Sequence, residues 1–482
     1  MPPLSHGDDS CARLYLSQFS LQFEPRLHTV AVTAGPGHFT MPIIILIPTI
    51  ICIVALFRVS VQRVFLDLYL PIFMMFPTYY FWKVATLPPI DLSEAILLPL
   101  GIAILIKESH RWRFAPMDLW VALFIFSACY ADRRNGQTTA STFELFDSLC
   151  TVLVPYMAGK LLIEHNAMRS IVVKRIVFCL FLASIVSIYE YRMEQNPFSL
   201  VAAHFFPDEH FAWKTQIRWG FGRISGPFGQ SELAGMMLFF GLVMTLWLGY
   251  NHLWEPKFSK AQWLPFKKST VIASTLGIVL LMTQARGPWI GAIAAVPIAL
   301  IGRSRRVLRT AILVGIFLAV GGSAAYIGLK AYANTDGPTT SSEQENAQYR
   351  TQLLDNYIPV AQKGGAWGWG QDFPRIGGQG SIDNEYLFVA LTQGWVGLLV
   401  FSMIALEALS NMLYGAIYNP TKRDRYFSYS LLGVYVGLLI TIFTVFLGNQ
   451  PFELFFLLAG WSQAARSKHV TKPQLAFEQV YT

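Results

Sequence analysis

Residues 269–302 read STVIASTLGIVLLMTQARGPWIGAIAAVPIALIG, which is two long apolar runs, 269–283 and 288–302, with Arg286 between them. A membrane-spanning helix needs about 20 mostly apolar residues, and somewhat fewer where the bilayer thins. An arginine at the membrane edge with no acidic neighbour in sequence is costly unless it meets an anion. This stretch therefore predicts a helical hairpin in a membrane, with an anion site at its turn.

The composition extends this interpretation to the whole chain. Its 482 residues are 54% hydrophobic and 14% charged, which is too apolar for a soluble domain. The apolar runs are long and continuous rather than alternating, so they predict helices. They lie at 41–57, 64–82, 92–106, 117–131, 144–163, 171–190, 231–250, 269–284, 287–302, 308–328, 385–410, 426–447 and 451–465. We expect an all-α, polytopic transmembrane helical bundle with about 12–13 spans, the first of which could be interfacial or re-entrant.

The runs divide the chain into seven expected regions. These are a loosely ordered N-terminal tail (1–40), N-terminal transmembrane helices (41–190), a first long loop (191–230), central transmembrane helices (231–328), a second, large loop (329–384), C-terminal transmembrane helices (385–465) and a C-terminal tail (466–482). The charge pattern described next places both loops outside, and the tail in the cytoplasm; the resemblance given below makes the loops periplasmic. Long loops among short ones are usually functional. In the first loop, residues 197–216 are rich in aromatics and suit a helix at the membrane surface. In the second, residues 335–346 are polar and expected to be mobile.

The net charge of +8 is best explained as an orientation signal. Basic residues fall in alternate loops, which the positive-inside rule assigns to the cytoplasm. Examples are the clusters at 107–113, 160–175, 303–309 and 422–425 and in the C-terminal tail. Arg133 and Arg134 break this pattern. The distribution argues against a nucleic-acid partner and favours membrane lipids as the surroundings.

Cysteine and histidine spacings predict neither a disulfide framework nor a metal site. Cys52, Cys129, Cys150 and Cys179 lie in or beside apolar runs, and Cys11 lies in the tail, so all five read as packing residues. No metal or other cofactor is expected.

Charged residues converge on the expected outer side. Arg223, Arg286 and Arg350 join a small cluster formed by Asp383, Asn384 and Glu385. Arginine forks match phosphate oxygens, and a carboxylate can deprotonate a hydroxyl group. This set predicts phosphoryl or pyrophosphoryl recognition beside a general base. Two structural alternatives stay open: Arg286 could snorkel to lipid headgroups, and Asp383 could cap the helix that begins near Asn384.

Three motifs resemble the O-antigen ligase and polymerase family of bacterial membrane proteins. Residues 223–234 (RISGPFGQSELA) are similar to its Arg-x-x-Gly-x-Phe segment, and residues 284–292 (QARGPWIGA) to its Ser-Arg-Gly-x-Trp-x-Gly hairpin. Residues 368–372 (GWGQD), 383–387 (DNEYL) and 394–398 (GWVGL) resemble its Gly-x-Gly loop and its His-Asn-x-Tyr-Leu…Gly-x-x-Gly-Leu element. The likeness covers about residues 223–400.

The resemblance implies a GT-C-like fold of about twelve helices and a metal-independent glycosyltransferase of the bacterial inner membrane. Its substrate would be a glycan on undecaprenyl pyrophosphate, transferred on the periplasmic side to a glycan or lipid acceptor. Arg223 and Arg286 would hold the pyrophosphate, with a less defined role for Arg350. Family ligases carry histidine, thought to activate the acceptor hydroxyl, where this chain has Asp383. That difference slightly favours a polymerase or another glycan transferase over a ligase.

Further substrate contacts are expected from Asn384, Glu385, Tyr386 and Trp369, although packing is an alternative for each aromatic ring. Two other functions stay open from sequence. One is a transporter or flippase for an anionic lipid or solute. The other is a non-catalytic component of polysaccharide export, because Asp383 replaces the usual histidine.

Overall fold

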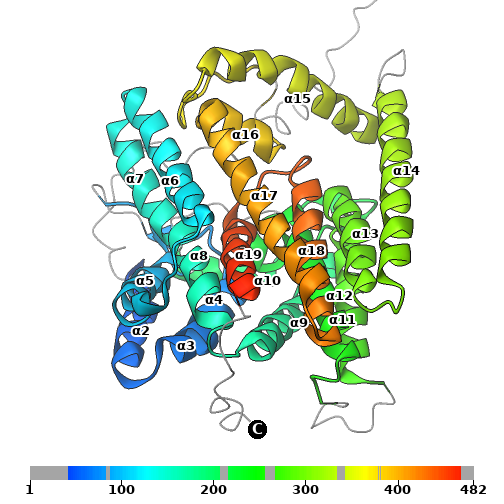
Figure 1. The fold of residues 1–482 in the computed structure, drawn as a ribbon. Coiled ribbons are helices and arrows are strands. Elements are labelled where there is room, and N and C mark those ends of the chain that lie inside the picture. Colours follow the sequence, from blue (N-terminus) through cyan, green and yellow to red (C-terminus); the bar gives the residue numbers. More distant parts are fainter. Residues whose placement is uncertain are drawn as a thin grey trace, which may run out of the picture.

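The computed structural model describes residues 42–82, 87–206, 215–255, 266–333, 342–377, 379 and 381–467. Helices dominate these ranges, with two short antiparallel ladders beside them (Figure 1). This agrees with the all-α class. The predicted tail 1–40 and nearly all of the tail 466–482 lie outside the described residues, as does Cys11.

The elements follow one another in this order. They are η2 (Pro42–Ile45), α2 (Leu46–Arg58), α3 (Val61–Val64), η3 (Phe65–Tyr69), α4 (Leu70–Met75), β1 (Phe81–Trp82), β2 (Ile90–Asp91), α5 (Glu94–Lys107), η4 (Ser109–Arg111), α6 (Pro116–Arg134), α7 (Thr138–Ser148), η5 (Leu149–Leu153), α8 (Val154–Ala158), η6 (Gly159–Ile163), α9 (Arg169–Met193), α10 (Pro197–Phe205), β3 (Ile217–Arg218), β4 (Phe221–Gly222), η7 (Gly226–Phe228), α11 (Ser231–Tyr250), α12 (Lys268–Met282), α13 (Arg286–Ile301), α14 (Val307–Ala333), α15 (Ser342–Gly364), α16 (Glu385–Thr392), α17 (Gly394–Tyr418), α18 (Lys422–Thr441) and α19 (Asn449–Ser467).

Every predicted apolar run overlaps one or more of these helices. Among the described residues, five helical stretches are long and apolar enough to cross a membrane: Thr138–Ile163, Arg169–Met193, Ser231–Tyr250, Val307–Ala324 and Gly394–Tyr418. Three shorter apolar helices are Leu46–Arg58, Lys268–Met282 and Arg286–Ile301. These helices are consistent with a multi-pass membrane protein.

Three predicted runs differ from the structure. One of them, 426–447, ends as a helix at Thr441. The run 64–82 ends as a helix at Met75, because Pro77 disfavours helical backbone in the residue before it. Its last residues form β1, which pairs with β2. The run 385–410 is two helices, α16 and α17. They separate at Gly394, which has a φ of +69° and meets the backbone of Gly368 too closely for any Cβ.

The expected periplasmic loops contain helices of their own. In the first, α10 lies within the predicted aromatic segment, and its Leu200 and Val201 are exposed. In the second, α15 begins at Ser342 and runs across the top of the bundle, above α16 and α17 (Figure 1). Residues 334–341, most of the segment predicted to be mobile, lie outside the described residues.

Two of the predicted cytoplasmic clusters meet at one end of the bundle. Arg169, which begins α9, pairs with Glu164 at 2.7 Å and with Asp424 of α18 at 2.6 Å. Nearby in sequence, Lys160 pairs with Asp118 at 2.6 Å. Both α9 and α18 therefore begin at this end. Their basic loops lie on the same side of the bundle, as the charge pattern predicted.

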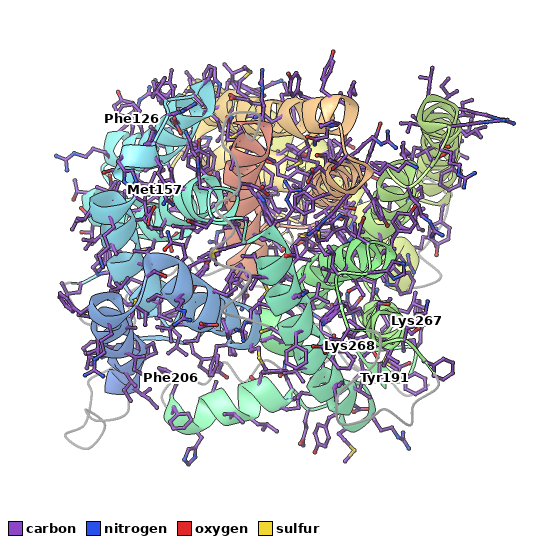
Figure 2. All side chains as sticks on the ribbon, turned by 60° about the horizontal axis from the view of Figure 1, so that its bottom comes forward. Phe126, Met157, Tyr191, Phe206, Lys267 and Lys268 are labelled. Atoms are coloured by element: carbon purple, nitrogen blue, oxygen red, sulfur yellow. The ribbon has the colours of Figure 1, made fainter. Side chains whose placement is uncertain are left out.

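Close helix packing depends on glycine in the bundle interior, where side chains fill the space between helices (Figure 2). A Cβ on Gly460 of α19 would overlap the carbonyl oxygen of Tyr156, and Met157 beside it is 1% exposed. The cysteines fit the same interior: Cys52, Cys150 and Cys179 are buried and unbridged. Small residues at such contacts let membrane helices approach closely.

Replacing Gly460 by Ala is therefore expected to destabilise the protein by about 1–3 kcal/mol, because the Cβ can be fitted only by moving a backbone. The matched control is Gly277→Ala on α12, where a Cβ meets nothing within 4 Å. There the better helix propensity of alanine should leave stability unchanged or raise it by up to about 1 kcal/mol. Thermal unfolding of the purified full chain, followed by tryptophan fluorescence, measures both. Equal melting temperatures for the two variants would contradict the close approach.

Candidate functional site

Arg286 is the first residue of α13, and its side chain is exposed. The preceding residue, Ala285, is the N-cap and makes no side-chain capping bond. The first backbone N–H groups of a helix have no partner within the helix and carry partial positive charge. Arg286 thus stands at a helix end that itself attracts anions, which is the placement the sequence predicted.

The turn before Arg286 is held in an unusual conformation. Gln284 is buried, has a φ of +51°, and within the described residues its Oε1 has no hydrogen-bond partner. Its carbonyl oxygen accepts a 2.8 Å bond from Arg218. Non-glycine residues rarely hold a positive φ, and such strain gathers at ligand sites. A strained residue with an unpartnered buried amide oxygen, among the described residues, thus lies two positions before Arg286.

Arg223 lies beside the same turn and is already engaged with protein groups. Its guanidinium pairs with Glu232 at 2.5 Å, donates to Gln216 Oε1 at 2.5 Å and reaches the carbonyl oxygen of Thr283 at 3.3 Å. The side chain is buried. These bonds use three of the five N–H donors of an arginine. Arg223 thus ties its own motif to the hairpin that carries Arg286.

Asp383 does not cap the following helix. Asn384 is the N-cap of α16, and its Oδ1 accepts from the backbone N–H of Leu387 at 3.1 Å. The structural role considered for the aspartate from sequence is therefore filled by its neighbour. The Asp383 carboxylate is therefore not used in helix capping. Asn384 has a structural role, as the N-cap of α16.

The surroundings of Asp383 make it a stronger base than an ordinary aspartate. Burial raises its pKa, and the nearby charge of Glu232 raises it too. A 2.5 Å hydrogen bond from Ser381 Oγ and the charge of Arg350 oppose the rise without cancelling it. The carbonyl oxygen of Ser381 accepts a 2.6 Å bond from Tyr349 of α15. A raised pKa increases the proton affinity of the carboxylate near neutral pH.

The end of α18 holds the two motifs together. Thr441 Oγ1 lies 3.4 Å from the carbonyl oxygen of Gly287, the residue directly after the hairpin arginine. The next carbonyl, of Ile442, accepts from the backbone N–H of Glu385 at 2.9 Å. Glu385 lies two residues after the aspartate of the other motif. Two segments about 100 residues apart in sequence thus share one support.

Three of the predicted substrate contacts are occupied by bonds within the protein. Glu385 is buried and accepts from the backbone N–H of Leu447 at 2.9 Å. Tyr386 donates to the carbonyl oxygen of Leu439 at 3.0 Å, and Trp369 donates to that of Val360 at 3.0 Å. The bonds of Glu385 and Tyr386 hold α16 against α18 and the segment that follows it, whereas the bond of Trp369 joins two parts of the large loop.

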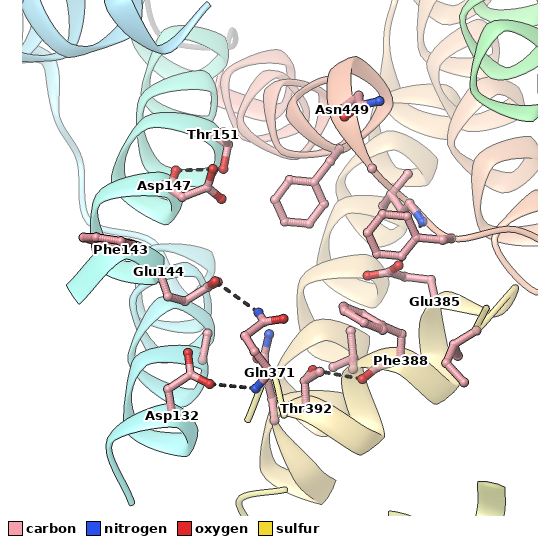
Figure 3. Close-up of a pocket in the computed structure, with 18 of the residues that line it drawn as sticks. Asp132, Phe143, Glu144, Asp147, Thr151, Gln371, Glu385, Phe388, Thr392 and Asn449 are labelled. Carbon is pink, nitrogen blue, oxygen red and sulfur yellow. Dashed lines mark hydrogen bonds between the residues drawn. The ribbon is translucent and has the colours of Figure 1, made fainter. Parts of the chain in front are cut away.

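A cavity of about 370 Å³ lies next to this site. Its lining includes Ile382 and Glu385, near Asp383 in sequence, and Gln230 and Leu233, near Glu232, but neither Asp383 nor Glu232 itself. The close-up in Figure 3 shows α6 and α7 on one wall and α16 on the facing wall. A volume of this size is in the range of small-ligand pockets.

Sequence reasoning missed several of these partners. Glu232 stands inside a quoted motif, so its carboxylate nine residues after Arg223 was a usable signal. Tyr349 and Ser381 gave no signal, because an uncharged hydroxyl in a loop is common. In the wall of the cavity, Glu144 and Asp147 of α7 lie inside the expected span 144–163, and Asp132 of α6 directly follows the expected span 117–131.

Comparison with known proteins gives one family. Residues 271–402 match the model of a protein family described as O-antigen ligase. The matched stretch contains Arg286, Arg350, Trp369 and Asp383, whereas Arg223 precedes it. A search of curated proteins gives no match.

Proposed function

We propose that this chain is an inner-membrane glycosyltransferase. The premise is that the match over residues 271–402 assigns it to the O-antigen ligase and polymerase family. It moves a glycan from undecaprenyl pyrophosphate to an acceptor hydroxyl on the periplasmic side, as a polymerase or a ligase. The family implies transfer of this type; the carrier lipid, the side of the membrane and the site residues are our proposal.

The state of Asp383 is the observation that carries this proposal. Its carboxylate is not used as a helix cap, its pKa is raised by burial, and it feels the charges of Glu232 and Arg350. A base of this kind suits removal of a proton from a hydroxyl group at neutral pH. The aspartate therefore takes the task that the histidine performs in family ligases.

The reaction follows from this arrangement as a single displacement. Asp383 accepts the proton of the acceptor hydroxyl while its oxygen attacks the anomeric carbon of the lipid-linked sugar. The bond between that carbon and the pyrophosphate oxygen breaks, and the electron pair leaves with undecaprenyl pyrophosphate. We expect inversion at the anomeric carbon, because one displacement reverses the configuration.

The positive groups stabilise the leaving pyrophosphate. Arg286 and the first N–H groups of α13 face its developing charge, and Arg350 supplies a second guanidinium near Asp383. Arg223 keeps the hairpin in place through Thr283 and has further donors for the same anion. The energy of transfer comes from the activated sugar–pyrophosphate bond.

Reconstitution into vesicles tests the function. The full chain is incubated with an undecaprenyl-pyrophosphate-linked oligosaccharide, and either a second lipid-linked repeat unit or lipid A–core is added. Products are separated by size and identified by mass spectrometry. A new glycosidic bond, with release of undecaprenyl pyrophosphate, supports the proposal, and the acceptor that is used distinguishes polymerase from ligase. Movement of the lipid between leaflets without any new glycosidic bond would show a flippase instead.

A further inference from the structure

One face of α13 carries a charge at its first turn and a row of exposed apolar side chains below it. Arg286, Ile290 and Ile293 are exposed, and Leu300 continues the row. Residues three, four and seven apart lie above one another on a helix, so these side chains share one face. Elsewhere α13 packs against α11 and α18. The exposed face therefore has the outline of an anionic lipid, with a cation at one end and an apolar track leading away from it.

The hairpin of β3 and β4 brings a tryptophan to the upper end of this track. Trp219 lies at the tip of the hairpin, and the centroid of its ring is 6.4 Å from that of Trp289. Arg218, the residue before the tip, donates to the carbonyl oxygen of Gln284 at 2.8 Å. Trp289 is three residues after Arg286, so the two are neighbours on α13. The tip of the hairpin thus lies beside the turn that presents the arginine.

Trp219 is held at the tip at a conformational cost. The register of β3 and β4 leaves a connection of two residues, in which Trp219 and Gly220 have φ values of +53° and +77°. Positive φ at both positions is the pattern of a type I′ turn, which prefers asparagine, aspartate or glycine and strains a bulky side chain. The side chain of Trp219 is nevertheless 55% exposed. A strained tryptophan that the chain covers only in part points to a ligand that covers the rest.

The rest of the hairpin is apolar as well. Ile217 and Phe221, on either side of the tip, are exposed, and Phe221 stacks on Tyr191 of α9 with the ring centroids 4.9 Å apart. Tryptophan favours the boundary of a membrane, where the headgroup of a lipid meets its hydrocarbon chain. The hairpin and the exposed face of α13 together suit a hydrocarbon chain whose charged end lies near Arg286.

We propose that the surface formed by Trp219, Trp289, Ile290 and Ile293 binds the polyprenyl chain of the donor lipid, where that chain leaves the pyrophosphate. The pyrophosphate meets Arg286 in the proposed reaction, so the chain attached to it begins within reach of the first turn of α13. A bulk phospholipid needs only an exposed apolar helix face, whereas this surface includes a strained residue. The inference rests on the proposed function, because it locates the carrier chain of the same donor.

The strain at Trp219 allows a variant that removes the ring without weakening the fold. Trp219→Asn places the favoured Asn-Gly pair in the turn, so the melting temperature should be unchanged or higher. Two donors carry the same glycan pyrophosphate, one on an undecaprenyl chain and one on an ethyl group. Wild-type protein should prefer the undecaprenyl donor in kcat/KM, and Trp219→Asn should lower that preference by about tenfold, the usual effect of losing one large apolar contact. The rate with the ethyl donor should not change.

Two further variants control this measurement. Trp219→Phe keeps an aromatic ring and should retain most of the preference for the undecaprenyl donor. Tyr418→Asn removes an exposed aromatic ring at the last residue of α17 and should retain all of it. Equal kcat/KM for the two donors in wild-type protein, or an unaltered preference in a folded Trp219→Asn, would overturn the proposal.

Photolabelling gives a readout that needs no turnover. Undecaprenyl pyrophosphate with a diazirine near its charged end is irradiated with the wild-type protein in vesicles, and the labelled peptides are identified by mass spectrometry. The label should concentrate on residues 217–221 and 286–293, and an excess of unlabelled undecaprenyl pyrophosphate should remove it. A phospholipid with a diazirine at the same depth provides the comparison. If the phospholipid labels these residues equally, and undecaprenyl pyrophosphate does not displace it, bulk lipid covers the surface and the proposal fails.

The two assays separate this inference from the proposed function. If wild-type protein forms glycosidic bonds, but Trp219→Asn keeps the chain preference and the label spreads over the bundle, only the location of the chain is wrong. If it forms none, yet the label concentrates on this surface and is displaced, the surface remains a polyprenyl site and the transferase proposal fails.

Discussion

Replacing Asp383 by Asn is expected to lower the rate of glycan transfer by about 10²–10⁴-fold, the usual contribution of a positioned general base. Asparagine keeps the shape of the side chain and can still accept from Ser381, but it cannot take a proton from the acceptor hydroxyl. Binding of the lipid-linked donor should change little. The measurement is the rate of product formation in reconstituted vesicles, with donor binding determined separately.

The pH dependence supplies a second readout of the same residue. Only the deprotonated carboxylate acts as a base, so the rate should fall as pH drops through the pKa of Asp383. Burial raises that pKa above its ordinary value, so the loss should begin at a higher pH than for a solvent-exposed aspartate. Asp383→His should retain part of the activity, with its acid limb moved towards the histidine range.

The matched control is Asp355→Asn, which makes the same change at an exposed position of α15. It should transfer glycan at the wild-type rate. Full activity in Asp383→Asn, or an acid limb that is the same in wild type and Asp383→His, would remove the aspartate from the role of base.

Replacing Arg286 by Ala is expected to lower transfer by about 10²–10³-fold, similar to the loss of one donor that stabilises a developing anion. The residue stands at the N-terminus of α13, so its removal takes the largest positive charge from that end. Arg286→Lys should recover only part of the rate, because lysine offers a point charge in place of a two-pronged fork. Initial rates at saturating acceptor measure both variants.

Arg192→Ala is the control for charge at this end of the bundle. Arg192 is exposed in the last turn of α9, the opposite end of that helix from Arg169. Its removal should leave transfer unchanged. Equal losses in Arg192→Ala and Arg286→Ala would mean that the arginine acts through general surface charge rather than through contact with the pyrophosphate.

Local sequence was enough to predict the helices. In a helix, the backbone N–H and C=O groups of an apolar run bond to each other. Whether such a helix forms in a membrane therefore depends on residues within the run. The hairpin of α12 and α13 shows this, because its turn was expected between the two runs and Arg286 begins the second helix. The predictions were wrong at the ends of helices and at breaks between them. There, contacts with residues distant in sequence determine where a helix stops. Gly394 separates α16 from α17 because its backbone lies against Gly368.

The sequence by itself determined that this chain forms apolar helices, with Arg223, Arg286, Arg350 and Asp383 between them or at their ends. The tertiary structure alone decided what each charged group does. Asn384 takes the helix cap and releases Asp383, and Glu232 engages Arg223. The carboxylates of α6 and α7 face a cavity beside that aspartate. The physical reason is that hydropathy sums over neighbours in sequence, whereas the strength of a charge or a base is set by burial and by partners that only folding brings near.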